Sequence, residues 1–249
     1  MRAEPGTESA KLRREAVPAA FDAAAGAYDR LVGASPGYHE HLRLSARRMG
    51  LAGDGRGLRL LDAGCGTGAS AAALLAVAPR AQIVAIDASA GMLARARAKR
   101  ELTAVQFVHT PVEDLADAGV RGPFDGILAA YLIRNLPDPD RALRALHAIL
   151  RPGATLAVHE YSVRDSPRAR AVWHGVCCGI IIPAGWLLTG DAGLYRYLRR
   201  SVDHFDGAAR FRQRLRDAGF ASVHSEPMPG WQRGIGYTFL GSRDPVDRT

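Results

Sequence analysis

The sequence predicts an α/β protein with a doubly wound, mostly parallel seven-stranded sheet and a helical lid insertion. Two observations lead to this fold class. From Leu58 onward, short apolar runs alternate with helical patterns, which is typical of parallel βαβ units. The 249 residues also have the length of one large domain with a terminal extension.

The predicted elements follow in order from these runs. The first five strands are expected in LRLLDAG, QIVAIDA, VQFVHT, DGILAAYLI and TLAVHEY, and a final pair in ASVHSEP and IGYTFLG. Helices are expected in ASAAALLAVA, SAGMLARARAKR and PDRALRALHAIL, where Leu143, Leu146 and Ile149 would face the sheet. The turn at residues 151–154 ends the last helix and starts a strand. A ligand of such a sheet sits at the carboxyl ends of its strands.

The segment after Tyr161 changes this rhythm. RARAVWHGVCCGIIIPAGWLLTG is strongly apolar, but glycines and Pro183 interrupt it. Because a transmembrane helix needs about 20 uninterrupted apolar residues, we expect no membrane span here. Residues 164–206 are instead expected to form a helical insertion that covers the top of the sheet.

Charge and cysteine content narrow the class of protein. Nearly all positive charge behind the formal net charge of +8 comes from arginine, because Lys11 and Lys99 are the only lysines. This preference for arginine over lysine fits a GC-rich genome as well as a binding surface. The run RYLRRSVDHFDGAARFRQRLR mixes acids with its bases, which favours a solvated helical face or an anionic membrane surface over a nucleic-acid groove. Three cysteines are too few for a disulfide framework, and we expect no metal site.

The ends of the chain complete the predicted organisation. MRAEPGTESAKLRREAVPAA lacks the apolar core of a signal peptide, so we expect a cytoplasmic protein. Residues 1–20 are expected to form a flexible leader, residues 21–241 the domain and residues 242–249 a tail.

A glycine-rich loop, LLDAGCGTG, follows the first strand and opens the first helix. Gly64, Gly66 and Gly68 would let the backbone turn tightly and approach a ligand at the helix N-terminus. Asp87 ends the second strand, where an acid can accept hydrogen bonds from two ribose hydroxyls. The loop and the acid together predict an adenosine-type ligand.

The loop spacing, with Asp62 two residues before the first glycine, resembles the D-x-G-x-G-x-G motif of class I S-adenosylmethionine-dependent methyltransferases. A dinucleotide loop would read G-x-G-x-x-G, which disfavours a NAD-dependent oxidoreductase. The resemblance implies the Rossmann-like methyltransferase fold and S-adenosyl-L-methionine as cofactor. The cofactor-binding residues that it implies are Tyr28, Asp62, Gly64, Cys65, Gly66, Thr67, Gly68, Asp87, Ala88, Met92, Val112 and Ala130.

Structural roles remain open for three of these residues. Cys65 would be a small filler between glycines rather than a nucleophile. Met92 would pack in the core, and Tyr28 would pack within its helix.

The stretch AAYLIRN, after the fourth strand, narrows the resemblance. It lacks the Asn/Asp-Pro-Pro-aromatic motif of enzymes that methylate DNA bases, so nucleic acid is not expected as a partner. Its Arg-Asn pair resembles the ubiquinone and menaquinone biosynthesis C-methyltransferases. FDAAAGAYD, LHAILRPGATLAVHEYS and IIPAGWLLTGDAGLYRYLRRSVDHF resemble the same family, so that the match covers about residues 21–241.

This resemblance implies a chemistry in which a ring carbon becomes a nucleophile only after the neighbouring hydroxyl loses its proton. Arg134 could stabilise the phenolate, and Asn135 could orient Arg134 or a water. Arginine stays protonated, so the base would be His159, Glu160 or a water, and both side chains could equally be structural. The implied catalytic residues are Arg134, Asn135 and Glu160.

The apolar segment from Val172 to Leu188 fits a lipophilic substrate tail, and equally a helical cap on the core. Peripheral membrane contact at the inner face and a homodimer are compatible with it. Leu132 and the Pro111-Val112 pair depart from the family pattern. The alternatives are therefore an O-, N- or C-methyltransferase of secondary metabolism with another apolar or phenolic substrate, or a cofactor-binding partner protein without catalysis.

Overall fold

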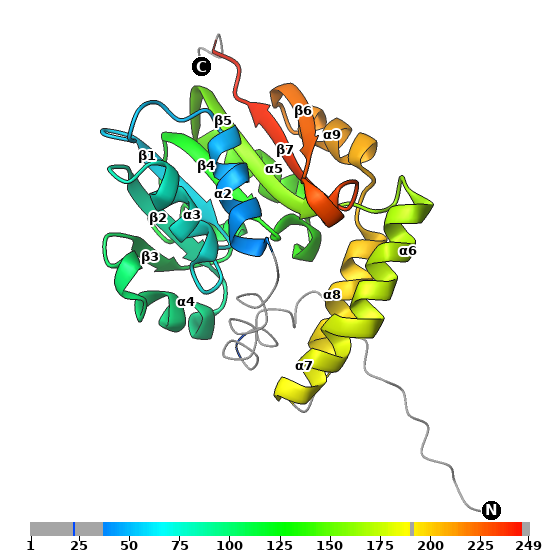
Figure 1. Cartoon of the computed structure of the whole chain (residues 1–249). Helices are drawn as coiled ribbons and strands as arrows, with labels where there is room; N and C mark the ends of the chain where they lie inside the picture. Colours follow the sequence, from blue (N-terminus) through cyan, green and yellow to red (C-terminus); the bar gives the residue numbers. More distant parts are fainter. Residues whose placement is uncertain (1–21, 23–36, 190–191, 246–249) are drawn as a thin grey trace, which may run out of the picture.

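The computed structural model describes residues 22, 37–189 and 192–245, so the predicted leader and Tyr28 lie outside the described residues (Figure 1). A seven-stranded sheet with the order β3-β2-β1-β4-β5-β7-β6 forms its centre. The parallel strands are β1 (Arg59–Ala63), β2 (Gln82–Asp87), β3 (Gln106–His109), β4 (Phe124–Ala130) and β5 (Leu150–Tyr161). The antiparallel pair is β6 (Ala221–Pro227) and β7 (Gly236–Ser242). The predicted fold class is confirmed.

Helices cover both faces of the sheet (Figure 1). One face carries α2 (Tyr38–Arg48), α3 (Ala69–Val77) and α4 (Ala90–Arg97), and the other carries α5 (Pro139–Ile149) and α9 (Ala208–Asp217). On β1, Leu60 packs in the core beneath α2, α3 and α4, and Leu61 packs in the core beneath α5 and α9. Because both faces are covered, the parallel strands are continuous apolar runs in the sequence.

Side-chain caps fix where two of the helices begin. The Ser89 hydroxyl accepts a hydrogen bond from the Met92 N–H at the start of α4, at 3.1 Å. The Asp138 carboxylate accepts one from the Arg141 N–H, and Pro139 supplies the first residue of α5. Short 3₁₀ turns complete the connections: η2 (Arg100–Leu102), η3 (Val112–Asp114), η4 (Ile133–Asn135) and η6 (Gly230–Gln232).

Two strand boundaries differ from the predicted ones. β4 ends at Ala130 rather than near Ile133, because Tyr131 adopts a positive φ of 56° and the chain then enters η4. β5 already begins at Leu150, since Leu150 pairs with Phe124 and the register shifts before Thr155 pairs with Gly126. The predicted turn at residues 151–154 is therefore an irregularity within β5.

The segment between β5 and α9 folds into a pair of helical arms, here named the α6–α8 hairpin (Pro167–His204), which projects beside the sheet (Figure 1). α6 (Pro167–Val176), a π-helical turn (Cys177–Ile181) and α7 (Ile182–Thr189) follow one another directly, and α8 (Gly193–His204) packs against them.

The glycines and Pro183 that interrupt the apolar run in the sequence do not interrupt the succession of α6, the π turn and α7. The π turn ends at Ile181, two residues before Pro183, and its wider geometry accommodates a ring that lacks an N–H donor. By length and composition alone, Pro167–Leu187 could cross a membrane, with 21 residues and a mean hydropathy of 1.2. Only 17% of that window is buried.

Candidate active site

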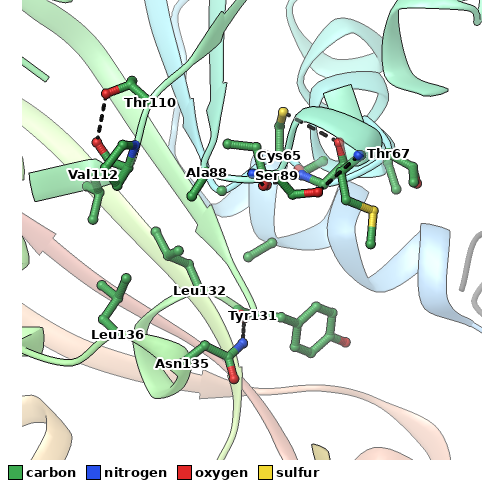
Figure 2. A pocket seen from close by; sticks show the side chains of 18 of the residues that line it. Cys65, Thr67, Ala88, Ser89, Thr110, Val112, Tyr131, Leu132, Asn135 and Leu136 are labelled. Carbon is green, nitrogen blue, oxygen red and sulfur yellow. Dashed lines mark hydrogen bonds between the residues drawn. The ribbon is translucent and has the colours of Figure 1, made fainter. Parts of the chain in front are cut away.

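A cavity of about 360 Å³, here named the strand-end pocket, lies at the carboxyl ends of β1, β2 and β4 (Figure 2). This is the sheet edge at which a doubly wound fold is expected to bind its ligand. The cavity is lined by Tyr38, Gly64, Cys65, Gly66, Thr67, Ala69, Ser70, Asp87, Ala88, Ser89, Met92, Thr110, Pro111, Val112, Glu113, Ala130, Tyr131, Leu132, Asn135, Leu136 and Pro137.

The glycine loop forms one wall of the pocket through its backbone. Gly64 has a φ of 72°, and its N–H donates to the Ile86 carbonyl at 2.9 Å. A Cβ on Gly68 would lie 2.3 Å from Leu102, so this glycine permits close packing behind the loop. A Cβ on Gly66 would meet no atom within 4 Å. The loop therefore leaves open space for a ligand in front of Gly66.

Asp87 ties the loop to the end of β2. One of its carboxylate oxygens accepts from the Gly66 N–H at 2.7 Å and the other from the Ser89 N–H at 2.9 Å. Burial raises the pKa of Asp87, and these two hydrogen bonds oppose that shift. A carboxylate oxygen can accept more than one hydrogen bond, so Asp87 retains acceptor capacity toward the pocket.

Asp62 lies beneath the loop rather than on the pocket wall, and it is fully buried. Its Oδ2 accepts from the Ser70 hydroxyl at 2.7 Å, whereas Oδ1 has no hydrogen-bond partner among the described residues. Burial raises its pKa to about 7; the Ser70 hydrogen bond opposes this shift and the charge of Asp87 adds to it. Two buried acids at the glycine loop fit a cationic ligand, and S-adenosylmethionine carries a sulfonium and an ammonium group.

The predicted cofactor residues divide into two groups. Asp62 and Gly68 support the loop from behind. Burial raises the pKa of the Cys65 thiol well above its usual range, which fits a filler better than a nucleophile. The predicted residues that line the pocket are Gly64, Cys65, Gly66, Thr67, Asp87, Ala88, Met92, Val112 and Ala130.

Of the three predicted catalytic residues, the structure brings only Asn135 to the pocket wall. Its side-chain amide donates to the Tyr131 carbonyl at 2.8 Å (Figure 2). Arg134 and Glu160 form a buried ion pair of 2.5 Å away from the pocket lining. Burial raises the pKa of Glu160, and the Arg134 guanidinium opposes this effect.

Arg134 also joins the pocket to the α6–α8 hairpin. Its Nε donates to the Ser201 hydroxyl of α8 at 3.3 Å, and its guanidinium lies 5.2 Å from the centre of the Tyr131 ring. One turn earlier in α8, the Tyr197 hydroxyl donates to Oδ1 of the Asn135 side-chain amide at 3.2 Å. η4 is therefore held by the hairpin as well as by the sheet.

Several pocket residues were missed by sequence reasoning. Tyr131 stacks on Tyr38 with ring centres 5.7 Å apart, and no local motif marks either tyrosine. Ser89 precedes the second helical pattern as a serine N-cap, a signal that could have been used. Glu113 lines the pocket with an Oε1 that has no partner among the described residues. It supplies an acid directly after the Pro111-Val112 pair, which departs from the family pattern.

A model of the ubiE/COQ5 methyltransferase family matches residues 9–235 of the chain. The chain belongs to this family. As a member of the ubiE/COQ5 methyltransferase family it is an S-adenosylmethionine-dependent methyltransferase, which confirms the predicted enzyme class and cofactor.

Relatives of this family are similar over most of the chain. The ubiquinone/menaquinone biosynthesis C-methyltransferase of Bradyrhizobium diazoefficiens is 37% identical over 180 residues, covering 70% of each protein. The protein of the same name from Syntrophotalea carbinolica is 33% identical over 230 residues, covering 90% of this chain and 92% of its own length. The demethylmenaquinone methyltransferase of Thermus thermophilus is 32% identical, covering 72% and 82%.

Solved structures agree on the fold. The magnesium protoporphyrin IX methyltransferase of Synechocystis, solved with bound S-adenosylmethionine, has a TM-score of 0.64 at 15% identity and covers 94% of this chain and 99% of its own. At this identity the similarity speaks for the methyltransferase fold and not for a shared substrate.

Proposed function

We propose that this enzyme transfers a methyl group to a ring carbon of a prenylated quinone precursor in its phenol form. The observation that carries the proposal is the similarity, over 90% of the chain, to a ubiquinone/menaquinone biosynthesis C-methyltransferase. The apolar pocket residues Leu132 and Leu136 suit a flat ring, and the α6–α8 hairpin beside them suits an apolar prenyl tail. Secondary metabolism is the less favoured alternative.

We further propose how the pocket holds the cofactor. Backbone groups around Gly64 and Gly66 would meet the methionine part, with Asp62 beneath the loop favouring its positive charge. Asp87 would accept hydrogen bonds from the ribose hydroxyls, and Glu113 Oε1, which has no partner among the described residues, would accept one from the adenine amino group. The sulfonium supplies the methyl group when the cofactor is bound.

On the acceptor side, we propose that Asn135 contacts the ring hydroxyl directly and that Arg134 acts from behind. The ion pair with Glu160 keeps Arg134 away from the pocket lining. The positive charge of Arg134 would therefore act on the substrate across the Tyr131 ring and without direct contact. A cation next to a developing phenolate lowers the cost of removing its proton. Glu160 then serves to keep Arg134 in place.

The test is turnover with purified enzyme, S-adenosylmethionine and a chemically reduced, demethylated prenyl naphthoquinone, followed by mass spectrometry. A product heavier by one methyl group on a ring carbon is expected. Methylation of small phenols but not of the prenylated quinol would favour the alternative in secondary metabolism. Cofactor binding by calorimetry without any product would indicate a non-catalytic partner. In cells, loss of the gene should lead to accumulation of a demethylated quinone.

The outer face of the α6–α8 hairpin suggests where a lipophilic substrate is met. Four of the five large apolar side chains that are exposed in the described residues lie on it: Val172, Ile180, Trp186 and Leu187. No charged residue interrupts residues 171–187. Arg168 and Arg170 precede this stretch, and Arg196 and Arg200 of α8 are exposed as well.

We propose that this face lies on an anionic bilayer, so that the prenyl tail leaves the membrane next to the pocket. The apolar helix face would contact the acyl chains, and the arginines that border it would contact the anionic headgroups. The test is flotation with vesicles of phosphatidylcholine and phosphatidylglycerol, comparing wild type with the double variant Trp186→Ser and Leu187→Ser. Binding that is lost in the variant and weakened by salt is expected. Sedimentation as a dimer that the same variant dissociates would instead make this face a homodimer interface.

A further inference from the structure

The side-chain amide of Asn135 is held at both of its polar atoms. Its Nδ2 donates to the Tyr131 carbonyl at 2.8 Å (Figure 2), and its Oδ1 accepts from the Tyr197 hydroxyl at 3.2 Å. Asn135 lines the pocket, whereas Tyr197 is a half-buried residue of α8 outside the pocket lining. One contact therefore comes from the chain that follows β4, and the other comes from the α6–α8 hairpin.

These two partners fix the orientation of the amide. A backbone carbonyl can only accept a hydrogen bond, so the atom of Asn135 that faces the Tyr131 carbonyl must be the nitrogen. The other atom is then the oxygen, and the Tyr197 hydroxyl must be its donor. A reversed amide would place oxygen against oxygen at the Tyr131 carbonyl.

The second hydrogen of the amide nitrogen remains for the pocket. An amide nitrogen carries two hydrogens, and Asn135 gives one of them to Tyr131. Within the described part of the chain, no other acceptor takes the second one. In Figure 2 the amide oxygen points away from the labelled pocket residues Tyr131 and Leu132. Asn135 is thus arranged to donate a hydrogen bond to a ligand, and its acceptor atom is occupied by the hairpin.

A donor at this place suits the chemistry of the acceptor. Methylation of a ring carbon needs the neighbouring hydroxyl in its deprotonated form, and an N–H group that is already oriented stabilises such an oxyanion. An amide oxygen in the same place would repel the oxyanion. The Tyr197 hydroxyl prevents this, because it holds the oxygen of Asn135 on the side of the hairpin.

A second contact of α8 supports this role of the hairpin. One helical turn after Tyr197, the Ser201 hydroxyl accepts from Nε of Arg134 at 3.3 Å and donates to the Leu198 carbonyl at 2.8 Å. Residues one turn apart lie on the same face of a helix. α8 therefore presents one hydroxyl to each of the adjacent residues Arg134 and Asn135 of η4, and neither hydroxyl lines the pocket.

We propose that Tyr197 is a positioning residue that directs the free N–H of Asn135 toward the oxyanion of the acceptor. The inference rests on the proposed function, because it needs an acceptor with a deprotonated hydroxyl. A hydrogen bond to the charged form of a group lowers the pKa of that group. Loss of the Tyr197 hydroxyl should therefore raise the pKa of the bound acceptor hydroxyl and leave cofactor binding unchanged.

Tyr197→Phe tests the proposal in anaerobic assays with the reduced prenyl naphthoquinone. At pH 7, kcat is expected to fall about 10-fold, less than the about 100-fold loss in Asn135→Ala, because the donor is misdirected and not removed. The difference from wild type should shrink as the pH rises and more of the acceptor ionises. A merely structural role would lower kcat equally at every pH.

Two further variants separate the contact from the helix. Tyr195→Phe is the matched control, because it removes a phenol hydroxyl from the same helix outside the pocket lining and should keep the wild-type pH profile. The double variant Tyr197→Phe with Asn135→Ala should be no slower than Asn135→Ala alone, because Tyr197 acts only through this amide.

A final measurement needs no acceptor. In ¹⁵N spectra of the cofactor-bound protein, the side-chain amide signals of Asn135 are identified by their loss in Asn135→Ala. They should shift in Tyr197→Phe and remain in place in Tyr195→Phe. Unmoved signals in Tyr197→Phe would overturn the proposal, as would a loss of kcat that is equal at every pH or that multiplies with the loss in Asn135→Ala. If the wild type fails to methylate the quinol, the proposed acceptor is wrong, and the spectra still decide whether Tyr197 orients the amide.

Discussion

The strand-end pocket and the α6–α8 hairpin both contain many small and apolar residues. They differ in what is buried: the pocket region buries acidic groups, whereas the hairpin exposes apolar side chains to solvent. At the pocket, the glycine loop covers the fully buried Asp62, one of whose oxygens has no hydrogen-bond partner among the described residues. In the hairpin, Trp186 and Leu187 are 57% and 75% exposed. A buried polar atom without a partner and an exposed apolar face are both unfavourable in an isolated protein. They agree with the cationic cofactor of the first region and with the lipid surface that we propose for the second.

The largest expected effect comes from removing the Arg134 side chain, which connects the two regions. Arg134→Ala leaves Glu160 buried without its cation and removes the bond to Ser201 of the hairpin. The free energy of unfolding should fall by about 3–5 kcal/mol, measured by urea denaturation. Arg80→Ala is the matched control, because its ion pair with Asp54 is exposed and should contribute less than about 1 kcal/mol. Equal effects of the two substitutions would contradict a structural role for the buried pair.

Within the pocket, Asp87→Ala should weaken cofactor binding by about 1–3 kcal/mol, because buried hydrogen bonds are lost. Titration calorimetry with S-adenosylmethionine measures this change. Asp54→Ala, which removes a carboxylate outside the pocket, should bind like the wild type. An unchanged affinity in Asp87→Ala would refute the assignment of Asp87 to the ribose.

The buried acid Asp62 predicts a pH dependence. Its pKa is raised to about 7, so the folded state holds this proton more tightly than the unfolded state does. Its contribution to the free energy of unfolding is therefore greatest below about pH 4, the ordinary aspartate range, and is lost as the pH rises through 7. Urea denaturation without cofactor at pH 5 and pH 8 should show a smaller loss for Asp62→Asn than for the wild type. Parallel losses would mean that Asp62 is not the group that titrates.

The smallest effect is expected on the hairpin face. Trp186→Ser with Leu187→Ser should change the free energy of unfolding by no more than about 0.5 kcal/mol, because exposed side chains contribute little to folding. Leu93→Ala in the fully buried core of α4 should cost about 2–5 kcal/mol under the same conditions. A large loss of stability in the hairpin variant would mean that these side chains pack within the protein and are not held for a partner.

The sequence pattern was sufficient where local geometry sets the structure. The spacing of Gly64, Gly66 and Gly68 predicted the loop, since only glycine readily takes the positive φ values of 72°, 53° and 90° found there. It was insufficient at the ends of elements. Nothing near Tyr131 in the sequence indicates its left-handed backbone conformation, and nothing near residues 177–181 indicates the π turn.

The sequence by itself determined the order of strands and helices, the glycine loop with Asp87, and the family, because these depend on periodicity and on residues close together in the chain. Only the tertiary structure decided that Arg134 is paired with Glu160 rather than open to the pocket, and that Tyr197 holds the amide of Asn135. These partners lie 26 and 62 residues apart in the chain. Long-range packing brings them together, and no local pattern in the sequence encodes that arrangement.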